Sequence, residues 1–338
     1  MLVSDFDYDL PDDRIAQAPV EPRHAARLLV DRGPGNAAEH HRVRDLPTLL
    51  RPGDLLVVNR SRVLAARLEL RKSSGGRVEI LLLEPVAAEP GTWRALVRPS
   101  RRVAAGTTLE AGPLRITAGA DDGDGVRLVE LHHDGHPVDA ALADEVLADV
   151  GRVPLPPYIH RPLEDQRRYQ TVFASAPGSV AAPTAGLHLT PEVLDDLRVA
   201  GIEVAEVELH VGLDTFRPMT SDDPDEHRMH SERFVVDDEV LVACERATRV
   251  VAVGTTTVRS LESAVRGITD RTDIFIRPPW EWRVVDVMMT NFHLPRTTLL
   301  MMVEAFVGSR WRELYATALD EGYRFLSFGD AMLLERSR

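Results

Sequence analysis

The chain has 338 residues, enough for one large domain or two ordinary ones, and 44% of them are hydrophobic, so it can bury a substantial core. Its net charge of -13 argues against a protein that coats nucleic acid nonspecifically, because such binding depends on neutralising phosphates. The single cysteine, Cys244, excludes an intrachain disulfide and a cysteine-clustered zinc site. No apolar run is long enough to span a membrane and no secretory signal is recognisable, so we expect a cytoplasmic protein without membrane contact.

A buried strand followed by polar residues is predicted near residue 55. Leu55-Leu56-Val57-Val58 is an unbroken apolar run, which is typical of a strand covered on both faces of a sheet. Asn59 and Arg62 follow this run closely, so their polar groups are candidates for binding at the end of the strand. The alternative is a capped turn in which the arginines are only solvated.

Between residues 63 and 131 the pattern changes to short alternating segments separated by glycine-rich and acidic turns. About six short strands without a helical pattern favour a small barrel or sandwich. We therefore predict an α/β domain made of residues 1–62 and 151–338, interrupted at 63–150 by an inserted β-barrel domain with a connecting helix. Loop arginines of this insert, Arg98, Arg101 and Arg102, either line a positive face for phosphates or are simply solvated.

The middle of the chain combines loop, helix and strand signals. Thr190 before Pro191 is a strong helix start, because the hydroxyl can accept from the first free backbone N–H groups. Residues 202–211 then alternate between apolar and polar side chains, which indicates a strand. His188 thus sits at a helix entrance and His210 at a strand end, where α/β proteins often place their chemistry. Either could equally be an ordinary surface or core histidine.

A second buried strand leads into a helix. Residues 250–254 are an apolar run that ends in glycine, and Thr255, Thr256, Thr257 and Arg259 come next. Backbone N–H groups at a helix start favour anionic or electron-rich ligand atoms. The phosphate-binding G-x-x-x-x-G-K motif is absent, and the alternative is a simple helix cap.

Histidines also occur later, beside other polar groups. His227, His230 and Glu232 are close in sequence, but they do not form H-E-x-x-H and no helical pattern surrounds them, so we predict no metal site. Strands are expected at 273–276 and 284–288, and a polar loop with Asn291 and His293 follows the second.

Loops after different strands therefore gather hydroxyl, amide and imidazole groups. They comprise residues 184–188, 255–259 and 291–293. The sequence predicts a pocket where these loops meet, at the carboxyl edge of a mostly parallel sheet with flanking helices.

These stretches also indicate a family. The segments DFDYDLP, PTAGLH, MHSE, GTTTVRSLE and TNFHLP occur in this order, among further matches over nearly the whole chain. The chain resembles the S-adenosylmethionine:tRNA ribosyltransferase-isomerase family of queuosine biosynthesis. The resemblance implies an α/β domain with an inserted β-barrel, in agreement with the change of pattern at residue 63.

The resemblance also implies the reaction. The ribosyl part of S-adenosylmethionine would be transferred to 7-aminomethyl-7-deazaguanine at the wobble position of tRNA and rearranged to an epoxycyclopentanediol, with release of adenine and methionine. S-adenosylmethionine is then a substrate, and no metal or prosthetic group is implied. We expect a monomer whose partners are this donor and tRNA.

The reaction needs a base for the acidified C5′ hydrogen and a donor for the leaving adenine, and imidazoles suit both tasks. Acid–base candidates are His188, His210, His230 and His293, with Glu232 orienting one of them or contacting the sulfonium. Candidate substrate-binding residues are Asn59, Arg62, Thr184, Gly186, Thr255, Thr256, Thr257, Arg259 and Asn291. Candidate tRNA-binding residues are Arg98, Arg101 and Arg102.

Some positions depart from the family pattern. Asp214 and Arg277 replace residues that are usually uncharged, which could alter the charge of the pocket or its rim. The alternatives are therefore a paralogue that uses the same chemistry on another acceptor and a noncatalytic RNA-binding protein with a relic pocket.

Overall fold

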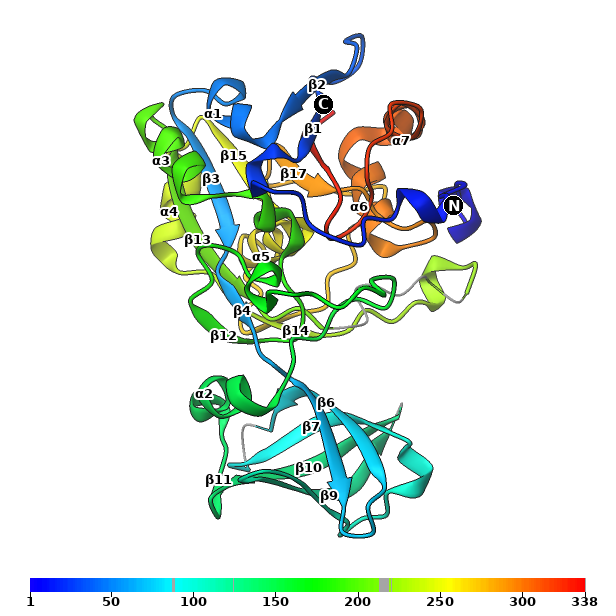
Figure 1. Cartoon of the computed structure of the whole chain (residues 1–338). Helices are drawn as coiled ribbons and strands as arrows, with labels where there is room; N and C mark the ends of the chain where they lie inside the picture. Colours follow the sequence, from blue (N-terminus) through cyan, green and yellow to red (C-terminus); the bar gives the residue numbers. More distant parts are fainter. Residues whose placement is uncertain (87–88, 124, 213–218, 220, 338) are drawn as a thin grey trace. The chain divides into compact units, whose positions relative to one another are not determined.

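The computed structural model describes residues 1–86, 89–123, 125–212, 219 and 221–337 (Figure 1). The chain forms two compact units. The larger unit consists of Met1–Ser61, Pro156–Ser175 and Ala182–Arg338, and the smaller of Arg62–Leu155 and Ala176–Ala181. Asp214, which the sequence singled out as a departure from the family pattern, falls outside the described residues.

The larger unit is built on a nine-stranded mixed sheet with the order β16-β14-β13-β3-β15-β17-β18-β1-β2. Its central strands β13, β3, β15 and β17 are mutually parallel, so their carboxyl ends meet at one edge. The strands are β1 (Arg27–Asp31), β2 (Glu39–Arg42), β3 (Asp54–Asn59), β13 (Glu203–Leu209), β14 (Glu232–Val235), β15 (Arg249–Val253), β16 (Arg271–Thr272), β17 (Val287–Asn291) and β18 (Ala331–Glu335).

Strand β3 is covered on both faces, as its apolar run predicts. Leu55 and Val57 point into one hydrophobic cluster, whereas Leu56 and Val58 point into another, because successive side chains alternate across a strand. All of these side chains are at most 1% exposed. Burying each one stabilises the fold by roughly 1.5–3 kcal/mol, which makes this strand a fixed platform for the residue that ends it.

Helices flank the sheet, and local chemistry determines where they begin. Thr190 caps α3, with its hydroxyl oxygen 3.4 Å from the backbone nitrogen of Val193, and Pro191 occupies the first helical position. Thr297 caps α6 in the same way through the nitrogen of Leu300. The helices are α1 (Leu46–Leu49), α3 (Pro191–Val199), α4 (Asp238–Arg246), α5 (Thr255–Ala264), α6 (Thr298–Val307) and α7 (Trp311–Asp320).

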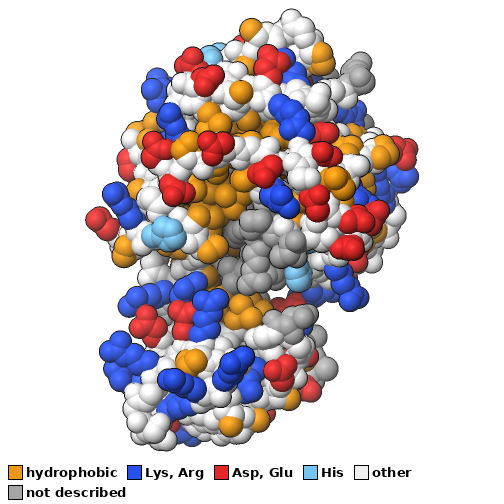
Figure 2. Space-filling view, turned by 90° about the vertical axis from the view of Figure 1, so that its right-hand side faces the viewer, with side chains coloured by type: hydrophobic (Ala, Val, Ile, Leu, Met, Phe, Trp, Pro, Cys, Tyr) orange, Lys and Arg blue, Asp and Glu red, His pale blue; other side chains and the backbone are white. Residues whose placement is uncertain are grey.

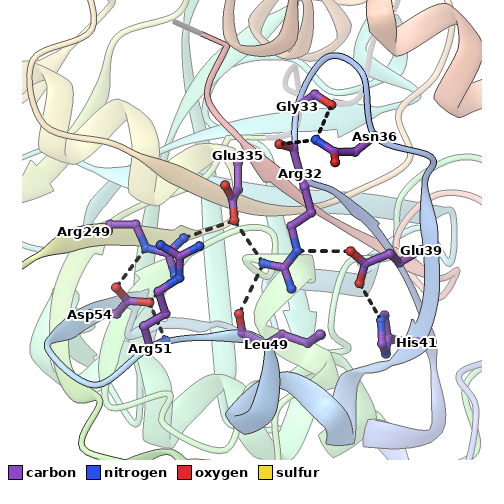
Figure 3. A network of polar contacts seen from close by, with 10 residues as sticks. All are labelled: Arg32, Gly33, Asn36, Glu39, His41, Leu49, Arg51, Asp54, Arg249 and Glu335. Atoms are coloured by element: carbon purple, nitrogen blue, oxygen red, sulfur yellow. Dashed lines mark hydrogen bonds and ion pairs between the residues drawn. The ribbon is translucent and has the colours of Figure 1, made fainter.

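The opposite edge of the sheet carries a closed network of charges (Figure 3). Arg249 at the start of β15 binds Asp54 at the start of β3, with its Nε 3.0 Å from Oδ1. Its other side reaches Glu335 at 3.1 Å, and Arg32 binds the same Glu335 oxygen at 3.0 Å. Asp54 is completely shielded from solvent, so its charge depends on these partners.

The smaller unit contains a closed antiparallel barrel in the order β5-β6-β7-β10-β9-β8, with β8 returning to β5. The strands are β5 (Arg67–Lys72), β6 (Arg77–Pro85), β7 (Thr92–Arg98), β8 (Thr108–Ala111), β9 (Leu114–Gly123) and β10 (Val126–His133); β11 (His136–Pro137), β4 (Ser61–Val63), β12 (Ala176–Ser179) and α2 (Ala140–Val150) complete the strands and helices. The predicted fold class, an α/β domain carrying a β-barrel, is confirmed; the large sheet, expected to be mostly parallel, is mixed, because β14, β18 and β2 each pair antiparallel with a neighbour.

The smaller unit also takes in segments outside the range 63–150 that the sequence suggested. Arg152 and Arg67 exchange backbone hydrogen bonds of 2.9 and 3.0 Å, and β12 pairs with β4. These pairings explain why residues 151–155 and 176–181 group with the barrel. In the part of the chain that is described, no helix has the length and apolar character needed to cross a membrane.

Candidate functional site

A cavity with about 580 Å³ of empty space, part of it open to solvent, lies in the larger unit at the carboxyl ends of β15 and β17. It brings together the loops that the sequence singled out: Thr184 from the 3-10 turn Thr184–His188, Thr255 and Thr256 from α5, and Asn291 and His293 after β17. The remaining lining residues are Tyr158, Ala182, Pro183, Ala185, Val211, Gly254, Thr290, Phe292, Leu294, Thr297, Leu299, Leu326 and Ser327.

The amide of Asn291 fixes the hydrogen-bonding direction of Thr184. Asn291 Nδ2 lies 3.2 Å from the carbonyl oxygen of Leu326 and 3.4 Å from that of Asp330. Carbonyl oxygens only accept, so the nitrogen must be on this side and Oδ1 on the other. Thr184 donates its hydroxyl hydrogen to Oδ1 at 3.0 Å, which leaves its lone pairs for a ligand in the cavity.

His188 stands behind Asn291 rather than in the cavity wall. Its Nε2 is 3.1 Å from Asn291 Nδ2 and therefore accepts, which requires an unprotonated nitrogen. Burial, with smaller contributions from the charges of Arg324, Arg168 and Arg23, lowers the pKa of His188 to about 3. The geometry thus places a neutral imidazole against the amide of Asn291.

A second side-chain amide, that of Asn59, makes the hydroxyl of Thr256 a hydrogen-bond acceptor, whereas the hydroxyl of Thr184 is a donor. Asn59 Oδ1 accepts from the backbone nitrogens of Leu209 at 3.1 Å and Ser61 at 3.0 Å, so its Nδ2 is the group that faces Thr256. Nδ2 donates to the Thr256 hydroxyl oxygen at 3.2 Å. Thr256 can therefore offer its own hydrogen to a ligand, whereas Thr184 offers lone pairs.

The start of α5 adds backbone donors. Gly254 has φ +89°, a left-handed conformation that glycine adopts without strain, and its N–H continues the sheet to Met289. The first helical bond runs from the nitrogen of Val258 to the oxygen of Gly254, so the N–H groups of Thr255 and Thr256 have no partner within the helix. The positive end of the helix dipole thus borders the cavity.

His293 lines the cavity and is held from several sides. Its ring Nε2 is 2.9 Å from the hydroxyl of Thr290. Its backbone N–H donates to the hydroxyl oxygen of Tyr315 at 3.0 Å, and its backbone carbonyl oxygen accepts from the hydroxyl of Tyr8 at 2.5 Å. Burial lowers the pKa of His293 to about 3, so the ring is neutral at neutral pH.

Glu232, Arg259 and His230 lie at a second cavity of about 460 Å³ in the same unit. Glu232 and Arg259 form a buried ion pair; Glu232 also accepts from the backbone nitrogen of Gly212 at 3.0 Å. His230 is exposed at the cavity. The two cavities share Leu299 in their walls, so the predicted site residues divide between two adjoining spaces.

The unusual Arg277 lies near this second cavity but is not part of its wall. It forms an ion pair with Asp225 and its guanidinium lies 5.1 Å from the centre of the Phe275 ring. Its charge is therefore matched locally.

Other predicted residues contact neither cavity. The backbone N–H of His210 donates to the carbonyl oxygen of Arg233. The hydroxyl of Thr257 donates to the carbonyl oxygen of Val253 at 2.7 Å. Gly186 is a packing position, because an added Cβ would be 2.9 Å from the Phe173 ring.

The remaining predicted arginines belong to the smaller unit. Arg62 forms an ion pair with Asp144 at 3.0 Å, whereas Arg98, Arg101 and Arg102 are exposed. Figure 2 shows numerous basic side chains on the viewed face of this unit.

Sequence reasoning did not anticipate Tyr158 and Ser327, whose hydroxyl oxygens are 2.7 Å apart in the wall of the first cavity. A tyrosine flanked by rigid proline backbone was the available signal, because such a segment can hold a side chain at a fixed place. Leu326, whose φ of +69° lies in the left-handed region, precedes Ser327 and turns the chain toward the cavity.

Comparison with known proteins identifies the family. Residues 3–334 match the family described as queuosine biosynthesis protein. The S-adenosylmethionine:tRNA ribosyltransferase-isomerases of Anaeromyxobacter sp. and Thermus thermophilus are 49% and 50% identical to the chain, covering 100% and 97% of it and 100% and 98% of their own lengths. A crystal structure of S-adenosylmethionine tRNA ribosyltransferase from Thermotoga maritima has a TM-score of 0.54 and 38% identity, covering 97% of this chain and 99% of that one. The chain therefore belongs to the S-adenosylmethionine:tRNA ribosyltransferase-isomerase family of queuosine biosynthesis.

Proposed function

We propose that the chain transfers and isomerises the ribosyl moiety of S-adenosylmethionine onto 7-aminomethyl-7-deazaguanine in tRNA, giving epoxyqueuosine in tRNA and releasing adenine and methionine. The observation that carries the assignment of the site is the convergence of Thr184, Thr256 and His293 on one cavity of about 580 Å³. Donor chemistry can take place there because the cavity combines hydroxyls, a helix start and a neutral imidazole, without a fixed charge among the described residues that line it.

The first cavity is proposed to hold the adenosyl part of the donor. Adenine has an amino group that donates and ring nitrogens that accept. Thr184 presents lone pairs and Thr256 presents a hydrogen, which is the complementary pair. The N–H groups at the start of α5 would stabilise the negative charge that develops on adenine as it leaves.

His293 is proposed as the base that removes the C5′ hydrogen. Deprotonation beside a sulfonium produces an ylide, in which the positive sulfur is balanced by the adjacent carbanion, and the imidazole gains a positive charge with the proton. The low pKa of His293 makes it a weak base in the free protein, but it also keeps the ring unprotonated over the whole neutral range. His188 supports Asn291, which orients Thr184, and is proposed as a positioning residue.

The tRNA is proposed to contact the exposed arginines of the barrel, Arg98, Arg101 and Arg102. Such contacts neutralise phosphates, so affinity should fall with salt by close to one unit of slope for each phosphate contacted. The cytoplasm is the proposed setting and the monomer the proposed form. The donor enters as a substrate, and none of these steps calls for a metal or prosthetic group.

The test is to incubate the chain with S-adenosylmethionine and tRNA that carries 7-aminomethyl-7-deazaguanine, and to follow adenine by chromatography. Release of adenine with this tRNA, together with a gain of the ribosyl-derived mass on the RNA, is the expected result. The control is the same tRNA with guanine at the wobble position, which lacks the attacking amine. Failure to release adenine with the modified tRNA would contradict the function.

A further inference from the structure

The second cavity has so far no part in the reaction, and its chemistry differs from that of the first. Its walls are mainly apolar or aromatic, and it has a buried carboxylate and guanidinium at its side. The lining residues are His227, Met229, His230, Glu232, Arg259, Ile274, Phe275, Ile276, Thr298, Leu299 and Met302. We propose that this cavity receives the 7-aminomethyl-7-deazaguanine base of tRNA, with Glu232 as the residue that recognises it.

The inference rests on the proposed function. It is supported by the match between the hydrogen-bond donors of the nucleobase and the carboxylate of Glu232. A guanine-type edge carries adjacent N1–H and amino donors, which pair with a carboxylate. Glu232 is the only carboxylate among the described residues that line the cavity, and it is only 5% exposed. A buried carboxylate needs an opposite charge, and Arg259 supplies it.

The hydrogen bonds of Arg259 favour a supporting role over direct binding of an amino-acid carboxylate. One terminal nitrogen is directed at Glu232 and the other at the carbonyl oxygen of Thr272, 3.2 Å away. The guanidinium thus holds the acid in place. This disfavours the methionine tail of the donor as the occupant, because its carboxylate would compete with Glu232 for the same cation.

The lining of the second cavity is compatible with a base attached to a polymer. His230 is exposed there and His227, Met229, Ile274 and Phe275 are half-buried, so the cavity can be reached from the surface, as a nucleotide still joined to its strand requires. Flipping a base into such a pocket costs a few kcal/mol, which contacts with apolar and aromatic walls can offset.

The electrostatics and the shared wall are consistent with the aminomethyl group. Burial and the neighbouring His230 lower the pKa of His227, so that ring is uncharged at neutral pH and does not repel a cation. Leu299 belongs to both cavities. The two cavities are therefore neighbours, which transfer from a sugar in the first to a base in the second requires.

The proposal is tested with Glu232→Gln and Ile274→Phe. Glutamine presents an amino group to the donor edge of the base, and phenylalanine narrows the cavity from a half-buried position while Glu232 and Arg259 stay unchanged. We expect KM for modified tRNA to rise about 10-fold or more in each, as for loss of a hydrogen bond to a charged group. The Kd of S-adenosylmethionine, measured by calorimetry without tRNA, should change less than about twofold because the donor is in the other cavity.

A matched control is Thr256→Val in the first cavity, which should weaken donor binding and leave KM for tRNA nearly unchanged. Free 7-aminomethyl-7-deazaguanine should compete with tRNA for wild-type protein, and this competition should be lost in Glu232→Gln. Thermal unfolding identifies a variant that fails to fold; if Glu232→Gln does, Ile274→Phe decides the question.

A rise in the donor Kd with an unchanged KM for tRNA in the folded variants would overturn the proposal and assign the cavity to the methionine tail. Unchanged values of both constants would also overturn it. If instead the wild-type protein releases no adenine with modified tRNA, the proposed function itself fails, which is a distinct result.

Discussion

The same strands begin and end in opposite kinds of chemistry. At one edge of the sheet, β3 and β15 start with Asp54 and Arg249, whose charges are matched within a closed network (Figure 3). At the other edge they lead to Asn59 and Thr256, which hold neutral groups with capacity left for a ligand. The first edge satisfies its polar groups internally and stabilises the fold, whereas the second keeps some of its hydrogen-bonding capacity for function.

The largest expected effect concerns the edge of the sheet that carries Asp54 and Arg249. Arg249→Met should lower the free energy of unfolding by about 3 kcal/mol, because it leaves the buried carboxylate of Asp54 without its main partner. Turnover at 25 °C should stay within about twofold, since the change is at the far end of the strands. Urea unfolding and adenine release measure the two quantities. The control Arg336→Met breaks the more exposed pair with Asp286 and should cost less than about 1 kcal/mol.

Asn291→Ala should lower catalytic activity strongly and stability less, the reverse of Arg249→Met. Removal of the amide frees Thr184 and His188 from their common partner, so kcat/KM should fall about 100-fold through loss of orientation. Stability should fall by only about 1–3 kcal/mol, the cost of buried groups left without a partner. Full turnover in a folded variant would show that the open edge does not depend on this amide.

A pH effect on stability is expected from the buried histidines. The pKa of His188 and of His293 is about 3 in the folded protein, against about 6.5 when unfolded. Between these values the unfolded chain binds more protons, so stability is present above pH 6.5 and is lost as the pH falls toward 3. Each histidine should lower the free energy of unfolding by about 2 kcal/mol as the pH falls from 6.5 to 5. Urea unfolding of His293→Gln at both pH values should show a smaller loss than wild type; an equal loss would contradict the assignment.

The smallest effect is expected for Thr256→Val, which keeps the shape of the side chain and removes the hydroxyl. The Kd of S-adenosylmethionine should rise about 10-fold, the value of one hydrogen bond in a cavity. Thr257→Val is the matched control, because that hydroxyl bonds to Val253 and does not reach the cavity. Calorimetry with the two variants compares them directly, and equal affinities would remove Thr256 from the donor site.

Local signals predicted the frame of the molecule well. The apolar run of β3, the cap at Thr190 and the short strands of the barrel each follow from neighbouring residues, and all were confirmed. The strand expected at 273–276 was wrong: pairing is limited to Arg271–Thr272, and Ile276 is buried by packing instead. Strand β17 also begins at Val287, later than the expected residue 284.

The site was less predictable because its chemistry depends on distant partners. That Asn291 lies in a polar loop could be inferred from the sequence, but its orientation depends on carbonyl groups of Leu326 and Asp330. The same holds for His188, a predicted acid–base candidate, whose contact with the amide of Asn291 joins distant parts of the chain. The separation of Glu232 and Arg259 into a second cavity likewise depends on where β14 and α5 meet.

The ends of the large sheet have a practical consequence for the protein at high concentration. Its outermost strands are β16, with two residues, and β2, whose sequence Glu-His-His-Arg is entirely polar. Short and charged outer strands are poor templates for addition of a strand from another molecule. In the closed barrel, each described strand from β5 to β10 already pairs with two neighbours, so none of them can accept a strand from another molecule. Intermolecular β-pairing through the large sheet or the barrel should therefore require prior unfolding, which favours crystallisation and titration of the folded chain at high concentration.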